Sequence, residues 1–422
     1  MPASVLWGWC RIRAWVRDTL GGLPAVFWYL WSGQLINRAG AFAILFLPLY
    51  LSDVRGTSET VTGVIVGGFG VGGALGSLLG GTLADRWGRR ATLVASHLAG
   101  AGLLLALGYT SNLAAIAVLA SLFGVVHAMP SPAFVAAIVD TVPQELRARA
   151  FNLQFWAGNL GMAVASFLAG LLAQASYLAL FLVDAASSLV TTAIIAWRVP
   201  ETLARTRKRT ESRRPGLRVV FTDRIFLVFV GLTLVLAILN TQTSTTVPLA
   251  MRADGLGPSA YGTVVALGGA LIVCGQLFIP RLIEKRLKHH VLALSTALLG
   301  LGFGALAFAD QLPLYLAAAV IWTLGAMLAA PPNAEINAEL APPALRARYQ
   351  AVFFLTFPAA AFIAPALGGA SLQYLGDWHW VISGALGLLA TLGHLAAGPP
   401  RERRVQATLG RATTPVGHRV AD

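Results

Sequence analysis

The sequence contains little charge, almost no lysine and almost no cysteine. Only 12% of its 422 residues are charged and 56% are hydrophobic, whereas about 25% of the residues in an average soluble domain are charged. A soluble protein of this length would need more charge to cover its surface, so a soluble enzyme and a disordered chain are excluded as leading interpretations. Its two cysteines, Cys10 and Cys274, are too few for a framework of disulfides.

What the sequence has instead is a series of long apolar stretches. Its mean hydropathy is +0.70, and its 44 glycines agree with the frequent use of glycine in transmembrane helices. A helix needs about 20 apolar residues to cross a bilayer. We therefore predict an all-α membrane protein with twelve transmembrane helices, at residues 27–51, 61–84, 91–110, 113–139, 151–173, 177–197, 225–250, 261–283, 290–309, 312–333, 349–375 and 378–398.

The basic residues are divided unequally between the two sides of this predicted topology. Of the 31 lysines and arginines, 28 lie in the termini and in alternate loops, and the opposite loops hold only Arg55 and Arg252. By the positive-inside rule, we expect the basic side to be cytoplasmic, with both termini there, in a bacterial inner (plasma) membrane. Nucleic-acid binding would need the net charge of +13 on one compact face, which this alternation excludes.

An internal repeat relates the two halves of the chain. At a constant offset of 199 residues, Leu-Arg-Ala-Arg at 146–149 matches 345–348, and Asp140 matches Glu339. Six predicted spans separate the copies, so the repeats are parallel, as in transporters that hold their substrate between two halves. We predict an N-terminal interfacial segment (1–26), a six-helix half (27–198), a cytoplasmic linker (199–222), a second six-helix half (223–398) and a cytoplasmic tail (399–422). The Trp- and Arg-rich start fits an interfacial helix or a frayed terminus.

The loop after the second predicted span carries Gly-Thr-Leu-Ala-Asp-Arg-Trp-Gly-Arg-Arg at 81–90. Its residues fit either a latch that closes the cytoplasmic side or a tight turn with positive-inside charge. This stretch resembles the loop signature of the major facilitator superfamily, and the resemblance covers residues 27 to 398. It implies a 6+6 secondary transporter in which this loop stabilises the outward-open state. The latch residues that the resemblance implies are Gly81, Asp85, Arg86, Gly88 and Arg89.

Other segments resemble bacterial exporters of drugs and small molecules. They are 37–40, 181–185 and 321–325. Two motifs of drug–proton antiporters differ in this sequence. Those transporters have an arginine about four residues before a glycine of the fourth span, where this sequence has Ala120 before Gly124. The fifth span has Ala165-Ser166 in place of their Gly-Pro pair.

Few titratable groups lie at membrane depth, where a charge is costly and usually functional or paired. Arg38 and Asp184 lie at similar predicted depths. Asp184 either exchanges a proton under the influence of Arg38 or forms a permanent ion pair with it. His127 fits a proton carrier or a packed histidine. Glu335 fits a gate at a cytoplasmic mouth or a solvated flank.

The resemblance also implies that spans one, four, seven and ten line a substrate cavity. Asn240 and Gln242 belong to a run of seven polar residues in the seventh span, and either face this cavity or join helices by hydrogen bonds. The candidate substrate contacts are Gln34, Asn37, Arg38, His127, Asn240, Gln242 and Trp322.

The sequence therefore predicts a secondary active transporter, most simply one that exports small organic compounds by alternating access and uses the proton gradient. Metabolite uptake or facilitated diffusion by the same fold, and a non-transporting membrane receptor, are the alternatives. We expect no enzyme activity, no cofactor and no metal, because no P-loop, nucleophile–base pair or metal-ligand cluster is visible. The expected partners are a small-molecule substrate, protons and membrane lipids, bound by a monomer without nucleic acid.

Overall fold

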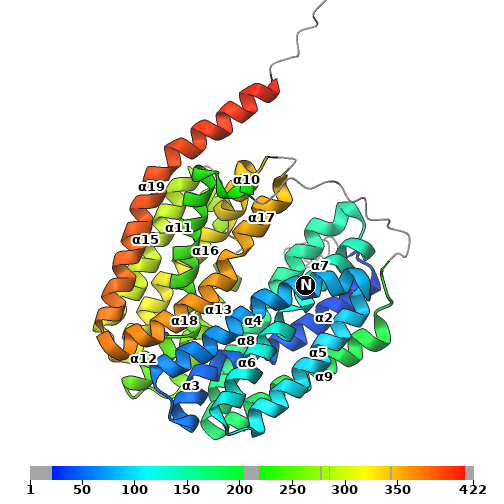
Figure 1. Cartoon of the computed structure of the whole chain (residues 1–422), viewed down its shortest axis with the longest axis vertical. Helices are drawn as coiled ribbons and strands as arrows, with labels where there is room; N and C mark the ends of the chain where they lie inside the picture. The colour runs from blue at the N-terminus through cyan, green and yellow to red at the C-terminus, as the bar shows by residue number, and fades with distance from the viewer. Residues whose placement is uncertain (1–20, 204–217, 276–277, 285, 343–344, 414–422) are drawn as a thin grey trace, which may run out of the picture. The chain divides into compact units, whose positions relative to one another are not determined.

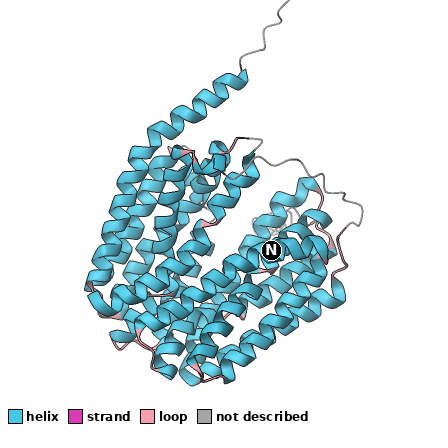
Figure 2. Cartoon of the chain, viewed as in Figure 1, coloured by secondary structure: helices cyan, strands magenta, loops and turns pink. Residues whose placement is uncertain are grey.

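A computed structural model describes residues 21–203, 218–275, 278–284, 286–342 and 345–413 (Figure 1). All regular secondary structure in these ranges is helical (Figure 2). Residues 1–20 of the interfacial segment predicted for 1–26 and most of the linker predicted for 199–222 lie outside them.

Twelve spans in the described residues are long and apolar enough to cross a membrane, which confirms the prediction from the sequence. They are formed by α2 (Ala25–Ala39) with α3 (Ala43–Arg55), α4 (Glu59–Arg86), α5 (Arg89–Tyr109), α6 (Leu113–Ala128) with α7 (Pro130–Thr141), α8 (Arg147–Ala175), α9 (Tyr177–Arg198), α11 (Arg224–Thr241), α13 (Pro258–Gly275), α15 (Lys288–Gly304), α16 (Leu312–Leu340), α17 (Arg346–Phe354) with α18 (Thr356–Leu375), and α19 (Trp378–Thr413). Shorter helices connect them: α10 (Arg218–Phe221), α12 (Val247–Ala253), α14 (Ile279–Ile283), η1 (Gln144–Leu146), η2 (Gln242–Ser244) and η3 (Ala305–Phe308).

Several spans are interrupted where the sequence weakens the helix. Gly40 ends α2, and α3 begins only at Ala43, so the first span is a broken helix. Pro130 opens α7 directly after α6 because a proline fits the first turn of a helix. The polar run of the seventh span ends α11, and Thr241 donates back to the carbonyl of Ala237 at 2.8 Å.

The last span continues past its predicted end. The sequence predicts an end at residue 398, but α19 runs through Pro399 and Pro400 to Thr413. The first part of the predicted tail is therefore helical, as the red helix in Figure 1 shows. Beside the two prolines, Nε of Arg401 donates to the backbone carbonyl of Ala397 at 2.9 Å.

The described chain forms two compact units that divide within the predicted linker, except that Phe46–Val71 groups with the second unit. Unit one contains the described residues up to Leu45 and those from Gly72 to residue 203. Unit two contains Phe46–Val71 and the described residues from 218 onward. Most of α3 and the first half of α4 thus belong with the helices of the second half of the sequence.

Glycine allows close helix contacts inside each unit. In unit one, a Cβ on Gly76 of α4 would lie 2.0 Å from the carbonyl oxygen of Val125 in α6. In unit two, a Cβ on Gly63 of the same helix would lie 2.0 Å from the carbonyl oxygen of Pro365 in α18. Both contacts join backbone to backbone, so a side chain at either position would force the helices apart.

Candidate functional site

A polar cavity lies in unit one beside the break in the first span. Its volume is about 160 Å³, and its lining comes from α2, α5, α6, α7 and α8. Helix ends that meet inside a membrane expose unpaired backbone groups, and transporters often place ligand sites at such breaks. The lining residues are Gln34, Asn37, Arg38, His97, His127, Pro130, Ser131, Phe134, Val135, Ile138 and Gln154.

Arg38, at the end of α2, and Asp184, from α9, lie beside the two helix ends at this break. Asp184 is 3% exposed, and its Oδ2 accepts from the backbone N–H of Ala43 at 3.2 Å, at the start of α3. Arg38 lies in the last turn of α2. Each charge therefore complements the dipole of the helix end beside it. The two side chains interact electrostatically, but among the described residues they form no direct ion pair. Of the alternatives that the sequence left open for these two residues, a direct ion pair is therefore not formed in this structure.

Two histidines complete the titratable group. His97 is 6% exposed, and its Nδ1 lies 2.8 Å from the carbonyl oxygen of Leu93. Only a protonated ring nitrogen can donate to a carbonyl, so this contact assigns the proton of the neutral ring to Nδ1. His127 packs against Phe123 at 5.5 Å between ring centroids. Arg38 interacts electrostatically with both histidines.

Amides and hydroxyls surround these charges. Gln154 of α8 donates to the side-chain oxygen of Gln34, and Asn37 donates to Oγ of Ser188 at 3.1 Å. A smaller adjoining cavity is lined by Asn37, both histidines and Asp184. The structure thus brings together five of the predicted site residues: Gln34, Asn37, Arg38, His127 and Asp184.

Sequence reasoning missed His97. It is the third titratable group buried around Arg38, and it was not among the candidates. The signal was available: His97 lies eight residues into the third span, and a titratable residue at that depth is itself an indication of function.

The cluster of Arg38, His97, His127 and Asp184 has no counterpart in the other half of the repeat. At the offset of 199 residues, the four titratable groups fall on Ala237, Thr296, Ala326 and Ser383, none of which carries a charge. Asp184, His97 and His127 can exchange protons beside the fixed charge of Arg38, since protonation of one changes the electrostatic energy of the others. The surrounding amides can bind neutral polar groups of a ligand.

The loop predicted to be a latch is held within unit one. Nε of Arg89 donates to Oδ2 of Asp140 at 3.0 Å, and Asp85 lies 3.5 Å from the same guanidinium. Gly88 has a φ of 115°, in the region that favours glycine. Gly81 lies inside α4, and a Cβ there would only touch Pro132 at 3.9 Å.

The loop also has a partner that the sequence did not suggest. Glu201 accepts from the backbone N–H of Arg89 at 2.8 Å and so caps α5. A side chain at Gly88 would collide with Glu201, since a Cβ there would lie 2.2 Å from its Oε2. Arg86 is exposed, and among the described residues its side chain makes no hydrogen bond or ion pair.

Unit two contains the repeat of this ion pair. Lys288 matches Arg89 and Glu339 matches Asp140 at the 199-residue offset, and Lys288 binds Glu339 within its own half. Glu335, predicted to gate a mouth or to lie on a solvated flank, accepts from the same ammonium at 2.9 Å.

The remaining cavity candidates, Asn240, Gln242 and Trp322, lie in unit two. Gln242 is 3% exposed and donates to Oγ of Ser383 in α19 at 3.1 Å, which is the helix-joining alternative. Trp322 is 3% exposed and stacks on Phe303 at 5.0 Å between ring centroids. Asn240 is exposed. In the described part of the chain, no three His, Cys, Asp or Glu residues gather in a way that suits a metal ion.

Comparison with known proteins agrees with this architecture. The family model of the Major Facilitator Superfamily matches residues 30–334 and 243–419. The uncharacterised MFS-type transporter YttB of Bacillus subtilis is 27% identical over 86% of this chain and 92% of its own length. The multidrug resistance protein MdtH of Aeromonas salmonicida is 23% identical over 86% of this chain and 93% of its own.

A solved structure shows the same fold at lower identity. The nucleoside transporter NupG superposes with a TM-score of 0.75 at 13% identity, over 89% of this chain and 99% of its own. At this identity the likeness establishes the fold alone.

Proposed function

Because this chain belongs to the Major Facilitator Superfamily, and is therefore a multi-pass membrane transporter rather than an enzyme, we propose that it exports small organic compounds by alternating access, driven by the proton gradient. The observation that carries the proposal is the cavity of unit one, where Arg38, Asp184, His97 and His127 lie together. Charged groups at membrane depth that interact in this way are typical of proton relays.

The lining of the cavity supports a substrate class. It offers one cation, one carboxylate, two imidazoles and several amides beside apolar surfaces such as Phe134 and Ile138. This combination suits amphipathic molecules with polar neutral groups. A carrier of polyanions would need several basic residues there. The relative MdtH, a multidrug resistance protein, supports export.

The proposed orientation in the membrane follows from the charges of the loops. We place both termini and the 28 basic residues of the termini and alternate loops on the cytoplasmic side of a bacterial inner membrane. The protein acts as a monomer there. The loop with Asp85 and Arg89 acts as the cytoplasmic latch, and the ion pairs of Arg89 with Asp85 and Asp140 hold the ends of α4, α5 and α7 in register.

The test uses cells that lack their own efflux pumps. Cells that express the protein are loaded with labelled drugs and dyes, and the exit of each compound is followed with and without a protonophore. We expect exit above the vector control that the protonophore abolishes. Asp184→Asn and His97→Gln should reduce this exit by about tenfold or more, because each removes a titratable group from the cavity. His290→Gln, an exposed histidine, is the matched control and should behave as wild type.

Other outcomes identify other functions. Accumulation of a metabolite, or transport that the protonophore leaves unchanged, identifies uptake or facilitated diffusion. No movement of any compound by protein present in the membrane, together with indifference to Asp184→Asn, identifies a non-transporting receptor.

A further inference from the structure

Arg38 carries a positive charge into unit one without a direct acidic partner. It lies in the last turn of α2 and lines the polar cavity of about 160 Å³. Among the described residues, its guanidinium makes no hydrogen bond and no ion pair. The side chain is half-buried, and none of its three nitrogens is fully covered by protein. A small molecule in the cavity can therefore reach donors that the protein leaves unused.

Asp184 does not use these donors, although its charge acts on Arg38. Its Oδ2 accepts from the backbone N–H of Ala43 at 3.2 Å, at the start of α3. A charge at membrane depth is costly and is usually paired or functional. The pairing of Arg38 is thus incomplete within the described chain, and a ligand that brings its own acceptor can complete it.

The rest of the wall favours a small occupant with an apolar body. The side-chain amides of Gln154 and Gln34 already bond each other. Phe134, Val135 and Ile138 supply apolar surface beside the guanidinium. An apolar cavity of about 150 Å³ is large enough to hold benzene. A molecule built on one ring therefore matches the volume of this cavity.

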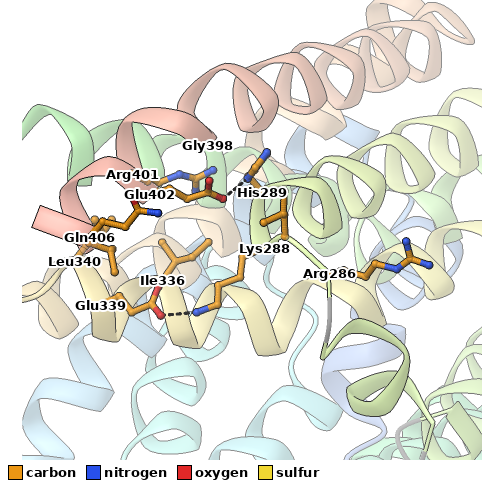
Figure 3. Close-up of a pocket in the computed structure, with 12 residues that line it drawn as sticks. Arg286, Lys288, His289, Ile336, Glu339, Leu340, Gly398, Arg401, Glu402 and Gln406 are labelled. Carbon is orange, nitrogen blue, oxygen red and sulfur yellow. Dashed lines mark hydrogen bonds and ion pairs between the residues drawn. The ribbon is translucent and has the colours of Figure 1, made fainter. Parts of the chain in front are cut away.

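A larger cavity, of about 320 Å³, lies in unit two among the ends of α15, α16 and α19 (Figure 3). Lys288 binds Glu339 there, and Nδ1 of His289 lies 2.7 Å from Oε1 of Glu402, as the dashed lines show. Arg286 points away from these groups in Figure 3. Two of its basic groups are thus paired with acids, and a further one points elsewhere. This cavity is a weaker candidate for an organic anion than the cavity beside Arg38.

We propose that the cavity of unit one binds an organic monocarboxylate, with the guanidinium of Arg38 holding the carboxylate and the apolar wall holding a body the size of one ring. A guanidinium matches the geometry of a carboxylate, remains charged at physiological pH and can donate two parallel hydrogen bonds to it. Surroundings of low dielectric constant strengthen this attraction. The inference deepens the proposed function by naming a substrate class, and it rests on that function only in taking the bound acid as the exported compound.

Binding is measured on the full-length protein, purified in detergent at pH 8, by isothermal titration calorimetry. The probes are benzoate and phenylacetate, each compared with its neutral amide, benzamide or phenylacetamide. We expect at least one acid to bind. Its amide should bind about tenfold more weakly or worse, because the amide keeps the shape of the acid and loses the negative charge.

Substitutions at Arg38 test its part directly. Arg38→Gln should weaken binding of the acid by about tenfold or more, whereas Arg38→Lys keeps the charge and should retain part of the preference for the acid. Asp184→Asn should bind the acid at least as tightly as the wild type, since it removes a negative charge that acts on the same guanidinium. The control Arg224→Gln removes an exposed charge at the start of α11 and should change affinity by less than about twofold.

The proposal is wrong if neither acid binds at millimolar concentration, or if each amide binds as tightly as its acid. Equal weakening by Arg38→Gln and Arg224→Gln would also overturn it. The comparison of acid with amide uses the wild type, so it decides even if Arg38→Gln does not fold. The measurement needs no proton gradient. A failure to bind leaves the proposed export of other compounds untouched, whereas binding without exit from cells contradicts export and not the site.

Discussion

Asp184 and Asp223 show how the surroundings of a carboxylate set its part in this protein. Asp184 is buried at a helix break and bonds backbone N–H groups. Asp223 lies just before α11, outside the spans, and accepts from Arg404 at 2.6 Å and from the hydroxyl of Tyr349 at 2.7 Å. Burial raises the pKa of Asp223, but these bonds and one from the N–H of Phe226 outweigh it, so its pKa lies below the ordinary value.

The lowered pKa of Asp223 predicts a pH-dependent contribution to stability. A carboxylate whose pKa is lower in the folded state stabilises that state above its unfolded pKa of about 3.9, and this contribution is lost as the pH falls through the folded pKa. We expect Asp223→Asn to reduce the free energy of unfolding by about 1–2 kcal/mol at pH 7. The difference from wild type should shrink below about pH 4.

Thermal unfolding of the purified protein between pH 3 and pH 8 checks this expectation. Asp310→Asn, which changes an exposed aspartate in the loop before α16, is the control and should leave the unfolding temperature unchanged. If the unfolding temperatures of Asp223→Asn and wild type differ by the same amount at every pH, the ionised carboxylate of Asp223 is not the cause of the stability difference.

At the scale of elements, α4 illustrates how small residues decide which helices meet. Its first half approaches α18, where a Cβ on Gly369 would lie 2.3 Å from the carbonyl oxygen of Glu59. Its second half approaches α6 through Gly72 and Gly76. The sequence showed the glycines and their use in close packing, but their partner helices come from distant parts of the chain.

The contact of α4 with α18 leads to a prediction. Gly63→Ala adds a methyl group where a Cβ would lie 2.0 Å from the carbonyl of Pro365. We expect this variant to lose stability by about 1–3 kcal/mol and to slow transport, because the two helices must move apart. Gly102→Ala in α5 is the matched control, since no atom lies within 4 Å of its Cβ position. That variant should be neutral or more stable by about 0.4–1 kcal/mol.

Unfolding temperatures and rates of compound exit, measured for both variants, test this prediction. Equal behaviour of Gly63→Ala and Gly102→Ala would show that the close approach does not matter for the folded or the transporting protein.

At the scale of the whole molecule, the distribution of basic residues predicts the orientation in the membrane. In a protein whose cysteines are replaced by serine, we expect Asp310→Cys to react with a membrane-impermeant maleimide in intact cells. Gln144→Cys, in the exposed turn between α7 and α8, should react only after the cells are opened, because it lies on the basic side. The reverse pattern of labelling would contradict the proposed orientation.

The repeat is symmetric in its scaffold and asymmetric in its chemistry. Arg89 with Asp140, and Lys288 with Glu339, form equivalent ion pairs at the 199-residue offset. Asp184 has only Ser383 as its counterpart. The halves therefore share the contacts that hold helix ends together, while the titratable cavity belongs to the first half alone.

The sequence by itself determined the twelve spans, the repeat and the family, because a bilayer imposes its thickness on every apolar stretch and a short signature marks the loop at 81–90. It also indicated Arg38, Asp184 and His127, because charge at membrane depth is conspicuous in a chain of this composition. Only the tertiary structure decided that Asp184 caps a broken helix and does not pair directly with Arg38. It alone placed His97 in the same cavity and turned Gln242 toward a neighbouring helix. These outcomes depend on which faces of distant helices meet, and the packing of side chains between helices sets those contacts.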